Sequence, residues 1–513
     1  MSRKVVRFKP IFIQKGRGPH LNDFVLTIDE NGDVFYSNIS VNNNGIIISN
    51  DNCLKKFSIS VRWNVEGYGY LYLPADNEGE LYEFPLNGEH VFNLNYELAK
   101  TRVYRNQKRF EKTKSMGFNP SNEILKLSEI ANDFLQKARL FEHDDLKCAE
   151  NSQKSLVYSL LVSELIEIEY ANYLIEKNSV RKNFLFGCDT RAYFKMDESL
   201  FFERFTELFN LATITHYLKG DIVDFEPEEG KKQFKERDIL LDKLLEKNIT
   251  VVGRPLFWTH GWVTPDWLYK KSYNELKNYL TNHVKEVISH YGNRIKIWEV
   301  VNELHDWANE LELNHNQTIE ITKLICEVAR DTNPEIKLLI NNCCPFADYI
   351  QRKKWFLKEA KYPQRTPYQF TKQLLDADVD FDLIGVQVYF VHRTITETVE
   401  FIERYEEFKK PLHLAEVGAP SKGITQEFCD EDLDWFTQPY EWHRHWDEEL
   451  QANWLEIIFS IAYSKKYIEA ANWYDFVDPY GFLKYGGLLR SVNGEKKSAC
   501  DRLIKLKQKL QLI

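Results

Sequence analysis

Several signatures of large protein classes are missing from these 513 residues. No G-x-G-x-x-G or P-loop pattern is present, which argues against a nucleotide-binding protein. The net charge is −10 and no stretch forms a basic stripe, so we expect no nucleic-acid partner. No segment approaches the roughly 18 consecutive apolar residues of a membrane-spanning helix, so we expect no membrane partner.

Cysteine usage and the N-terminal residues lead to an expectation about location. The eight cysteines form no C-x-x-C pair and have no histidine at metal-ligand spacing, so we expect buried thiols, no metal site and no cofactor. The first residues, MSRKVVRFKPIFIQ, lack an apolar core of signal-peptide length and a small-residue cleavage site. These features favour a cytoplasmic protein.

Aromatic residues, by contrast, are plentiful. They make up 14% of the chain and include 12 Trp and 27 Tyr. Flat aromatic side chains pack cores but also stack against sugar rings, so this composition favours a carbohydrate ligand. The chain is also too long for one ordinary domain, which predicts a large domain and at least one smaller one.

Two segments precede the main domain. Residues 1–115 show short alternating strands with turn residues such as Glu30-Asn31-Gly32-Asp33, which predicts a small antiparallel, sandwich-like β domain. This domain is either a structural accessory or a glycan-binding unit. Residues 116–182 change to helical spacing of apolar residues, which predicts a helical linker segment.

Residues 183–513 alternate apolar strands with amphipathic helices, a pattern typical of an α/β protein. Eight such units favour a (β/α)₈ TIM barrel over an open doubly wound sheet, which has fewer strands and a glycine-rich phosphate turn. The eight predicted strands span residues 183–187, 211–218, 249–258, 295–303, 336–342, 381–390, 411–418 and 469–476.

Two acids end apolar strands of this barrel. Asn-Glu occurs five times in the chain, but only Asn302-Glu303 closes a barrel strand, the fourth, and Glu416 closes the seventh. Strand C-termini open onto the active-site face of a TIM barrel, so the two carboxyl groups are expected to converge there. Glycoside hydrolysis usually requires such a pair. The alternative is that each acid forms an ion pair with Lys or Arg at the rim.

The segment from 183 to 505 resembles glycoside hydrolase family 10, the xylanase type. Trp298-Glu299-Val300-Val301-Asn302-Glu303 matches the family pattern Trp-Asp-Val-Val-Asn-Glu on strand four. The other resemblances are Gly253 to Trp258 with Thr264-Pro265-Asp266-Trp267 on and after strand three, Gly385-Val386-Gln387 on strand six, and His413-Leu414-Ala415-Glu416 on strand seven.

The resemblance implies roles for the matched residues. Glu303 would be the general acid/base, Glu416 the nucleophile of a retaining double displacement, and Asn302 a hydrogen-bond donor to the sugar 2-hydroxyl. The same subsite would be lined by Lys219, Trp258, Gln387 and Trp473. For Lys219 a rim ion pair remains an alternative, and for the two tryptophans simple core packing does.

Departures from the family cluster in the substrate pocket. Thr215-His216 replaces an acid and an amide, Arg254 and Tyr389 each replace a histidine, and Asn342 replaces an aspartate. We expect His216, Arg254 and Tyr389 to line the pocket, with the Tyr389 hydroxyl donating to the nucleophile. The Arg254 guanidinium would either favour ionised Glu416 or hold a substrate carboxylate, which suggests the hypothesis of an acidic glycone.

The sequence therefore predicts a retaining β-glycoside hydrolase, xylanase-like with an altered pocket, acting on a β-linked oligo- or polysaccharide. A carbohydrate-binding barrel that is catalytically weak or inactive is the alternative. Transglycosylation would use the same residues. Sugar identity, endo or exo action and oligomeric state do not follow from the sequence.

Overall fold

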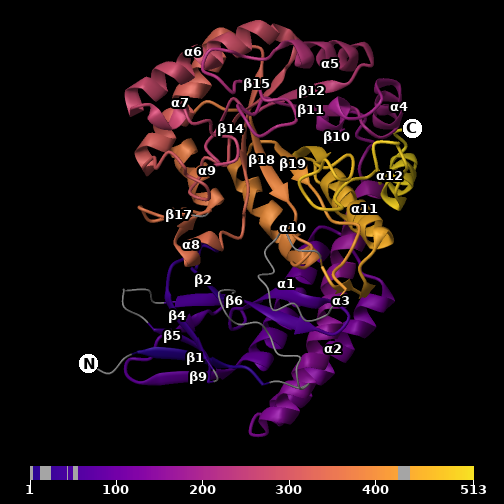
Figure 1. The fold of residues 1–513 in the computed structure, drawn as a ribbon. Helices are drawn as coiled ribbons and strands as arrows, with labels where there is room; N and C mark the ends of the chain where they lie inside the picture. The colour runs from indigo at the N-terminus through magenta and orange to yellow at the C-terminus, as the bar shows by residue number, and fades with distance from the viewer. Residues whose placement is uncertain (1–3, 12–24, 43, 50–55, 357, 426–438) are drawn as a thin grey trace.

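The computed structural model describes residues 4–11, 25–42, 44–49, 56–356, 358–425 and 439–513. Cys53 and Cys429, which we expected to be buried, lie outside these ranges. A barrel forms the upper part of the molecule in Figure 1, and two small sheets and long helices lie beneath it. Among the helices so described, none is long and apolar enough to cross a bilayer.

The N-terminal strands form two sheets. In the first, the order is β4 (Asn38–Asn42), β5 (Gly45–Ser49), β1 (Val5–Lys9) and β9 (Glu89–Asn93), with β1 and β9 parallel. In the second, the order is β3 (Val34–Phe35), β2 (Val25–Ile28), β6 (Lys56–Val65) and β7 (Gly69–Ala75), and β8 (Tyr82–Glu83) pairs with β6. The β2–β3 hairpin turns at the predicted site, where Gly32 has φ +80°.

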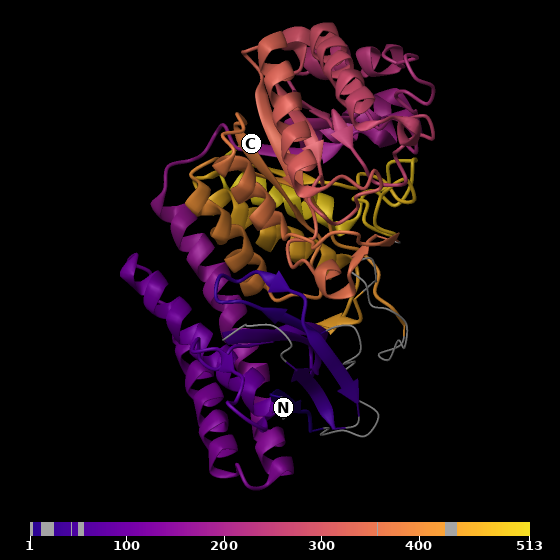
Figure 2. The same cartoon turned by 90° about the vertical axis from the view of Figure 1, so that its left-hand side faces the viewer.

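Three helices pack beside these sheets: α1 (Leu94–Ser115), α2 (Asn122–Leu140) and α3 (Asp145–Lys177). Figure 2 shows them as a layer along one side of the sheets. The helical segment thus begins at Leu94, earlier than the sequence pattern indicated. The reason is that α1 buries polar side chains such as Arg109, which bonds Glu167 of α3 (Nη2–Oε2 2.5 Å) and Glu403 of the barrel (Nη1–Oε2 2.8 Å), so its apolar periodicity is weak.

The remaining strands close into the predicted (β/α)₈ barrel. All barrel pairs are parallel, and the last strand pairs with the first. The third predicted strand is split in two at Pro255, which has no N–H for the ladder. In order, the strands are β10 (Leu185–Asp189), β11 (Leu211–Thr215), β12 (Thr250–Arg254) with β13 (Phe257–Trp258), β14 (Ile297–Asn302), β15 (Lys337–Asn342), β18 (Leu383–Val388), β19 (Leu412–Val417) and β22 (Ile468–Trp473).

Helices cover the outside of the barrel, as Figure 1 shows. They are α4 (Glu198–Leu208), α5 (Lys235–Glu246), α6 (Tyr273–Tyr291), α7 (His315–Thr332), α9 (Pro367–Asp376), α10 (Ile395–Arg404), α11 (Glu448–Ser464) and α12 (Ser498–Lys509). The long loop after β15 carries the short helix α8 (Tyr349–Arg352) and the hairpin β16 (Lys354–Trp355) and β17 (Lys358–Glu359).

The barrel interior changes from apolar to polar along the strands. One apolar cluster includes Leu211, Val252, Ile297, Leu339 and Leu383, from the first half of five strands. Side chains of a strand alternate between its two faces, so residues two positions further on face the same way. These positions hold polar residues, among them Thr213, Arg254, Glu299 and Asn341. The strand alternation therefore directs charged groups towards the carboxyl end of the barrel.

Candidate active site

Glu303 follows β14 in an unusual backbone conformation. Its φ is +52°, rare for a residue with a side chain, and its N–H donates to the Asn341 carbonyl (2.8 Å). The carboxylate accepts hydrogen bonds from Gln387 Nε2 to Oε1 (2.7 Å) and from Trp307 Nε1 to Oε2 (3.1 Å). Backbone strain of this kind concentrates at functional sites. The turn and two donors hold this carboxyl group in one orientation.

Glu416, on β19, is surrounded by three donors. Oε1 accepts from Arg254 Nη2 (2.5 Å) and from Asn341 Nδ2 (3.0 Å). Oε2 accepts from the Tyr389 hydroxyl (2.7 Å). The side chain is buried, and the donors come from β12, β15 and the residue after β18. The expected contact between Tyr389 and the predicted nucleophile is present in the structure.

Two amide side chains connect the acids. Gln387 lies beside Glu416 in the β18–β19 register and donates to Glu303. Asn341 Nδ2 lies within hydrogen-bond distance of both Glu416 Oε1 and Asn302 Oδ1 (3.2 Å). The fourth and seventh strands therefore bring Glu303, Asn302 and Glu416 to one site at the carboxyl end of the barrel.

The buried acids of this site hold their protons unusually well. Burial, together with the nearby Glu416 charge, raises the pKa of Glu303 to about 7. Burial also raises the pKa of Glu299, on β14, to about 8 against the opposing charge of Arg254, whose Nε lies 3.3 Å from Glu299 Oε2. Both carboxyl groups are largely protonated below neutral pH. Glu303 can then act as a proton donor.

Some hydrogen-bond donors at the site, among them those of Trp258 and Asn302, have no partner among the described residues. Trp258 on β13 and Asn302 on β14 are register partners. The Trp258 indole N–H and the Asn302 amide Nδ2 are buried, and neither meets an acceptor in the described part of the chain. Buried polar groups are rarely left unpaired, so these donors point to a ligand rich in hydroxyl groups.

Lys219 lies at the rim of the barrel. Its Nζ is 3.7 Å from Asp266 Oδ1, and about a third of its side chain (34%) is exposed. This is the ion pair that the sequence left open as an alternative. Throughout the described ranges, no group of three or more His, Cys, Asp or Glu side chains is arranged to hold a metal ion.

His216 and Trp473 are not brought to this group. The His216 Nε2 lies 3.0 Å from the Tyr291 hydroxyl on helix α6, and its ring packs against Trp298. Trp473 is fully buried and donates its indole N–H to the Gly486 carbonyl (3.0 Å). Strand alternation is the reason, because the neighbours Thr215 and Asn472 occupy the positions that face the barrel interior.

Other residues of the site were not singled out from the sequence. Asn341 contacts Glu416, whereas Asn342, which was compared with the family aspartate, donates to Thr371 (3.2 Å). The hydroxyl groups of Tyr217 and Tyr474 lie 2.8 Å apart. The position of Asn341, two residues after the apolar Leu339, would have indicated that it faces the interior. The other contacts depend on the loops after the strands.

Comparisons with known proteins identify the family of the barrel segment. The sequence profile described as Glycosyl hydrolase family 10 matches residues 176–505. Endo-1,4-beta-xylanase B of Thermotoga neapolitana is 29% identical over 294 residues, which are 55% of this chain and 75% of that protein. Beta-1,4-xylanase of Dictyoglomus thermophilum is 28% identical over 187 residues, 35% of this chain and 47% of that protein. Native xylanase 10B from Thermotoga maritima superposes with a TM-score of 0.48 at 21% identity, covering 66% of this chain and 98% of that one.

Proposed function

Because the chain belongs to glycosyl hydrolase family 10 and is a glycosidase, we propose that it cleaves a β-linked, xylan-type saccharide with net retention at the anomeric carbon. The observation that carries the proposal is the pair of acids in different environments. With a pKa of about 7, Glu303 carries its proton below neutral pH, whereas Glu416 is paired with the Arg254 cation. One acid is suited to donate a proton and the other to attack.

In the first step, a carboxylate oxygen of Glu416 attacks the anomeric carbon and the bond to the leaving oxygen breaks. The Glu303 proton passes to that oxygen, so the leaving group departs as an alcohol. In the second step, Glu303, now ionised, takes a proton from water, and the water oxygen displaces Glu416 from the sugar. Attack by another sugar hydroxyl in place of water would give transglycosylation.

The unpaired donors support binding of a neutral sugar at the same place. Asn302 Nδ2 is suited to the 2-hydroxyl of the sugar under attack, and Trp258 Nε1 to a neighbouring hydroxyl. Such bonds strengthen in the transition state and contribute to catalysis. A protein that only binds carbohydrate would not need a proton donor and a paired nucleophile beside these donors. The hydrolase is therefore favoured over the binding-only barrel.

The test uses an activated aryl β-glycoside and two variants. Glu416→Gln should reduce hydrolysis to background, because the attacking carboxylate is lost. Glu469→Gln, at an acid on β22 outside the catalytic group, is the control and should keep the wild-type rate. NMR of the first product should show the β-anomer. Wild-type activity in Glu416→Gln, or a first product of the α-anomer, would disprove the proposed mechanism.

A further inference from the structure

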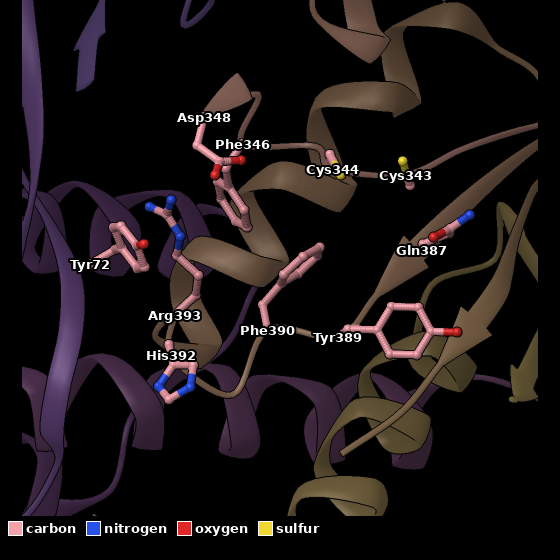
Figure 3. Close-up of a pocket in the computed structure, with 10 residues that line it drawn as sticks. All are labelled: Tyr72, Cys343, Cys344, Phe346, Asp348, Gln387, Tyr389, Phe390, His392 and Arg393. Carbon is pink, nitrogen blue, oxygen red and sulfur yellow. The ribbon is translucent and has the colours of Figure 1, made fainter. Parts of the chain in front are cut away.

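A pocket connects the candidate active site with the N-terminal sheet. Its empty space amounts to about 590 Å³ and is partly open to solvent, and Figure 3 shows Gln387 and Tyr389 at one end and Tyr72 at the other. Gln387 holds Glu303 and Tyr389 holds Glu416. Tyr72 comes from β7, more than 250 residues earlier in the chain. The pocket is therefore built jointly by the barrel and the N-terminal sheet.

The N-terminal sheet is firmly attached at this point. The Tyr72 backbone N–H donates to the His392 carbonyl (3.0 Å), and Arg393 Nη1 donates to Ser60 Oγ (3.2 Å) on β6. In the connection between β17 and α9, Thr366 Oγ1 donates to Asp33 Oδ1 (2.7 Å). An apolar cluster also joins Leu26 and Val34 of the sheet to Ala347, Tyr349 and Ile350 of the barrel loop. Tyr72 is thus held in place as a wall.

The position of the pocket indicates which part of a substrate it receives. It extends from Gln387 and Tyr389, which contact the two acids, over the loops after β15 and β18. The unpaired donor of Trp258 and the Tyr217–Tyr474 pair come from β13, β11 and β22, which lie on the other side of the barrel sheet order. If the glycone binds those residues, the leaving group must lie on the side of β15 and β18.

The pocket walls have the chemistry of a site for a neutral sugar. The Arg393 guanidinium lies between the rings of Tyr72 (4.1 Å) and Phe346 (4.0 Å). Asp348 lines the same pocket, and its negative charge acts on Arg393. One cation and one anion balance each other, so an acidic leaving group would gain little. Hydroxyl groups can donate to the carboxylate and accept from the guanidinium.

We propose that this pocket is the leaving-group subsite and that Tyr72 of the N-terminal sheet sets its length, so that the enzyme releases short neutral saccharides from the reducing ends of β-linked chains. The inference rests on the proposed function. It assigns the N-terminal sheet a role in substrate selection rather than in binding a separate glycan. Endo cleavage far from chain ends would require a leaving group that extends through Tyr72.

The test follows the length of the released fragment rather than the overall rate. β-1,4-Xylo-oligosaccharides of increasing length, labelled at the reducing end, are digested by the full-length enzyme, and labelled products are separated by chromatography. The wild-type enzyme should release label only on short fragments. Tyr72→Ala removes the wall and should release longer labelled fragments. Their share should rise about tenfold, which corresponds to a change of about 1.4 kcal/mol in the relative barrier for the two cleavage positions.

Tyr70→Ala is the matched control. Tyr70 lies two residues earlier on β7 and packs on Arg62 (4.6 Å), outside the pocket lining, so its fragment pattern should match the wild type. If Tyr72→Ala does not fold, Asp348→Ala tests the same subsite, because loss of this acceptor should weaken the preference for the short fragments.

The possible results are distinct. Long labelled fragments from the wild-type enzyme, or an unchanged pattern in both Tyr72→Ala and Asp348→Ala, would overturn the subsite while leaving the glycosidase proposal intact. An absence of cleavage of any oligosaccharide or aryl β-glycoside by the wild-type enzyme would instead contradict the proposed function itself.

Discussion

Arg254 Nη2 lies 2.5 Å from Oε1 of Glu416, and the same guanidinium places Nε 3.3 Å from Oε2 of Glu299. All three side chains are buried. Because burial raises the pKa of Glu299 to about 8, this acid is mostly neutral at pH 7. The Arg254 charge is therefore balanced by the Glu416 carboxylate. Nη1 is buried and has no hydrogen-bond partner among the described residues.

Removing the Arg254 charge should destabilise the fold. Arg254→Met leaves the Glu416 carboxylate buried without its cation, and breaking such a buried pair costs about 3 to 5 kcal/mol. Denaturant unfolding near neutral pH measures the loss. Arg254→Lys keeps the charge and should lose less. Equal stability of Arg254→Met and the wild type would show that the pair contributes nothing to the fold.

The same arginine allows a test of the acidic-glycone hypothesis. The guanidinium already contacts two protein carboxyl groups, so a third carboxyl group from the substrate would bring further negative charge to Glu416. We expect wild type and Arg254→Ala to show the same ratio of rates on neutral and uronic-acid-bearing β-glycosides. A rise of the neutral-to-acidic rate ratio in Arg254→Ala would instead indicate that Arg254 binds an acidic sugar.

Glu303→Gln should make the rate depend on the leaving group. A nitrophenolate departs without a proton, whereas an alkoxide from a sugar needs one. General acid catalysis is worth about 10²- to 10⁴-fold. In the first, glycosylation step the variant should therefore lose that factor in rate on oligosaccharides and much less on aryl glycosides. Pre-steady-state release of nitrophenol measures that step. Equal losses on both substrates would argue against Glu303 as the acid.

The pH profile should follow Glu303. With a pKa of about 7 its proton is present below neutral pH and is lost above it, so kcat/KM should fall as the pH rises past about 7. The hydrogen bond from Gln387 lowers the pKa of Glu303, because it favours the ionised form. Gln387→Leu should therefore move the alkaline limb to higher pH. An unmoved or acid-shifted limb would contradict this assignment.

Sequence patterns predicted the barrel well because strand and helix periods depend on local residue spacing. Helix α6 spans Tyr273–Tyr291 as the pattern indicated, and the eight strands lie within a few residues of the predicted bounds. The pair Glu303 and Glu416 was visible because both acids end apolar runs. Helix α1 was not predicted from the sequence because it buries polar side chains, which weakens its apolar periodicity. The charged partners of these side chains come from α3 and the barrel.

What the sequence by itself determined was the order of strands and helices, the closed barrel and the two acids at its carboxyl end. The tertiary structure alone decided which neighbours touch these acids. Packing placed His216 against Tyr291 and Trp473 against the Gly486 carbonyl, brought the Asn341 amide to Glu416, and put Tyr72 of the N-terminal sheet in a pocket with Gln387. Contacts between distant segments depend on how the sheets and loops pack in three dimensions, and residue spacing along the chain carries no record of that packing.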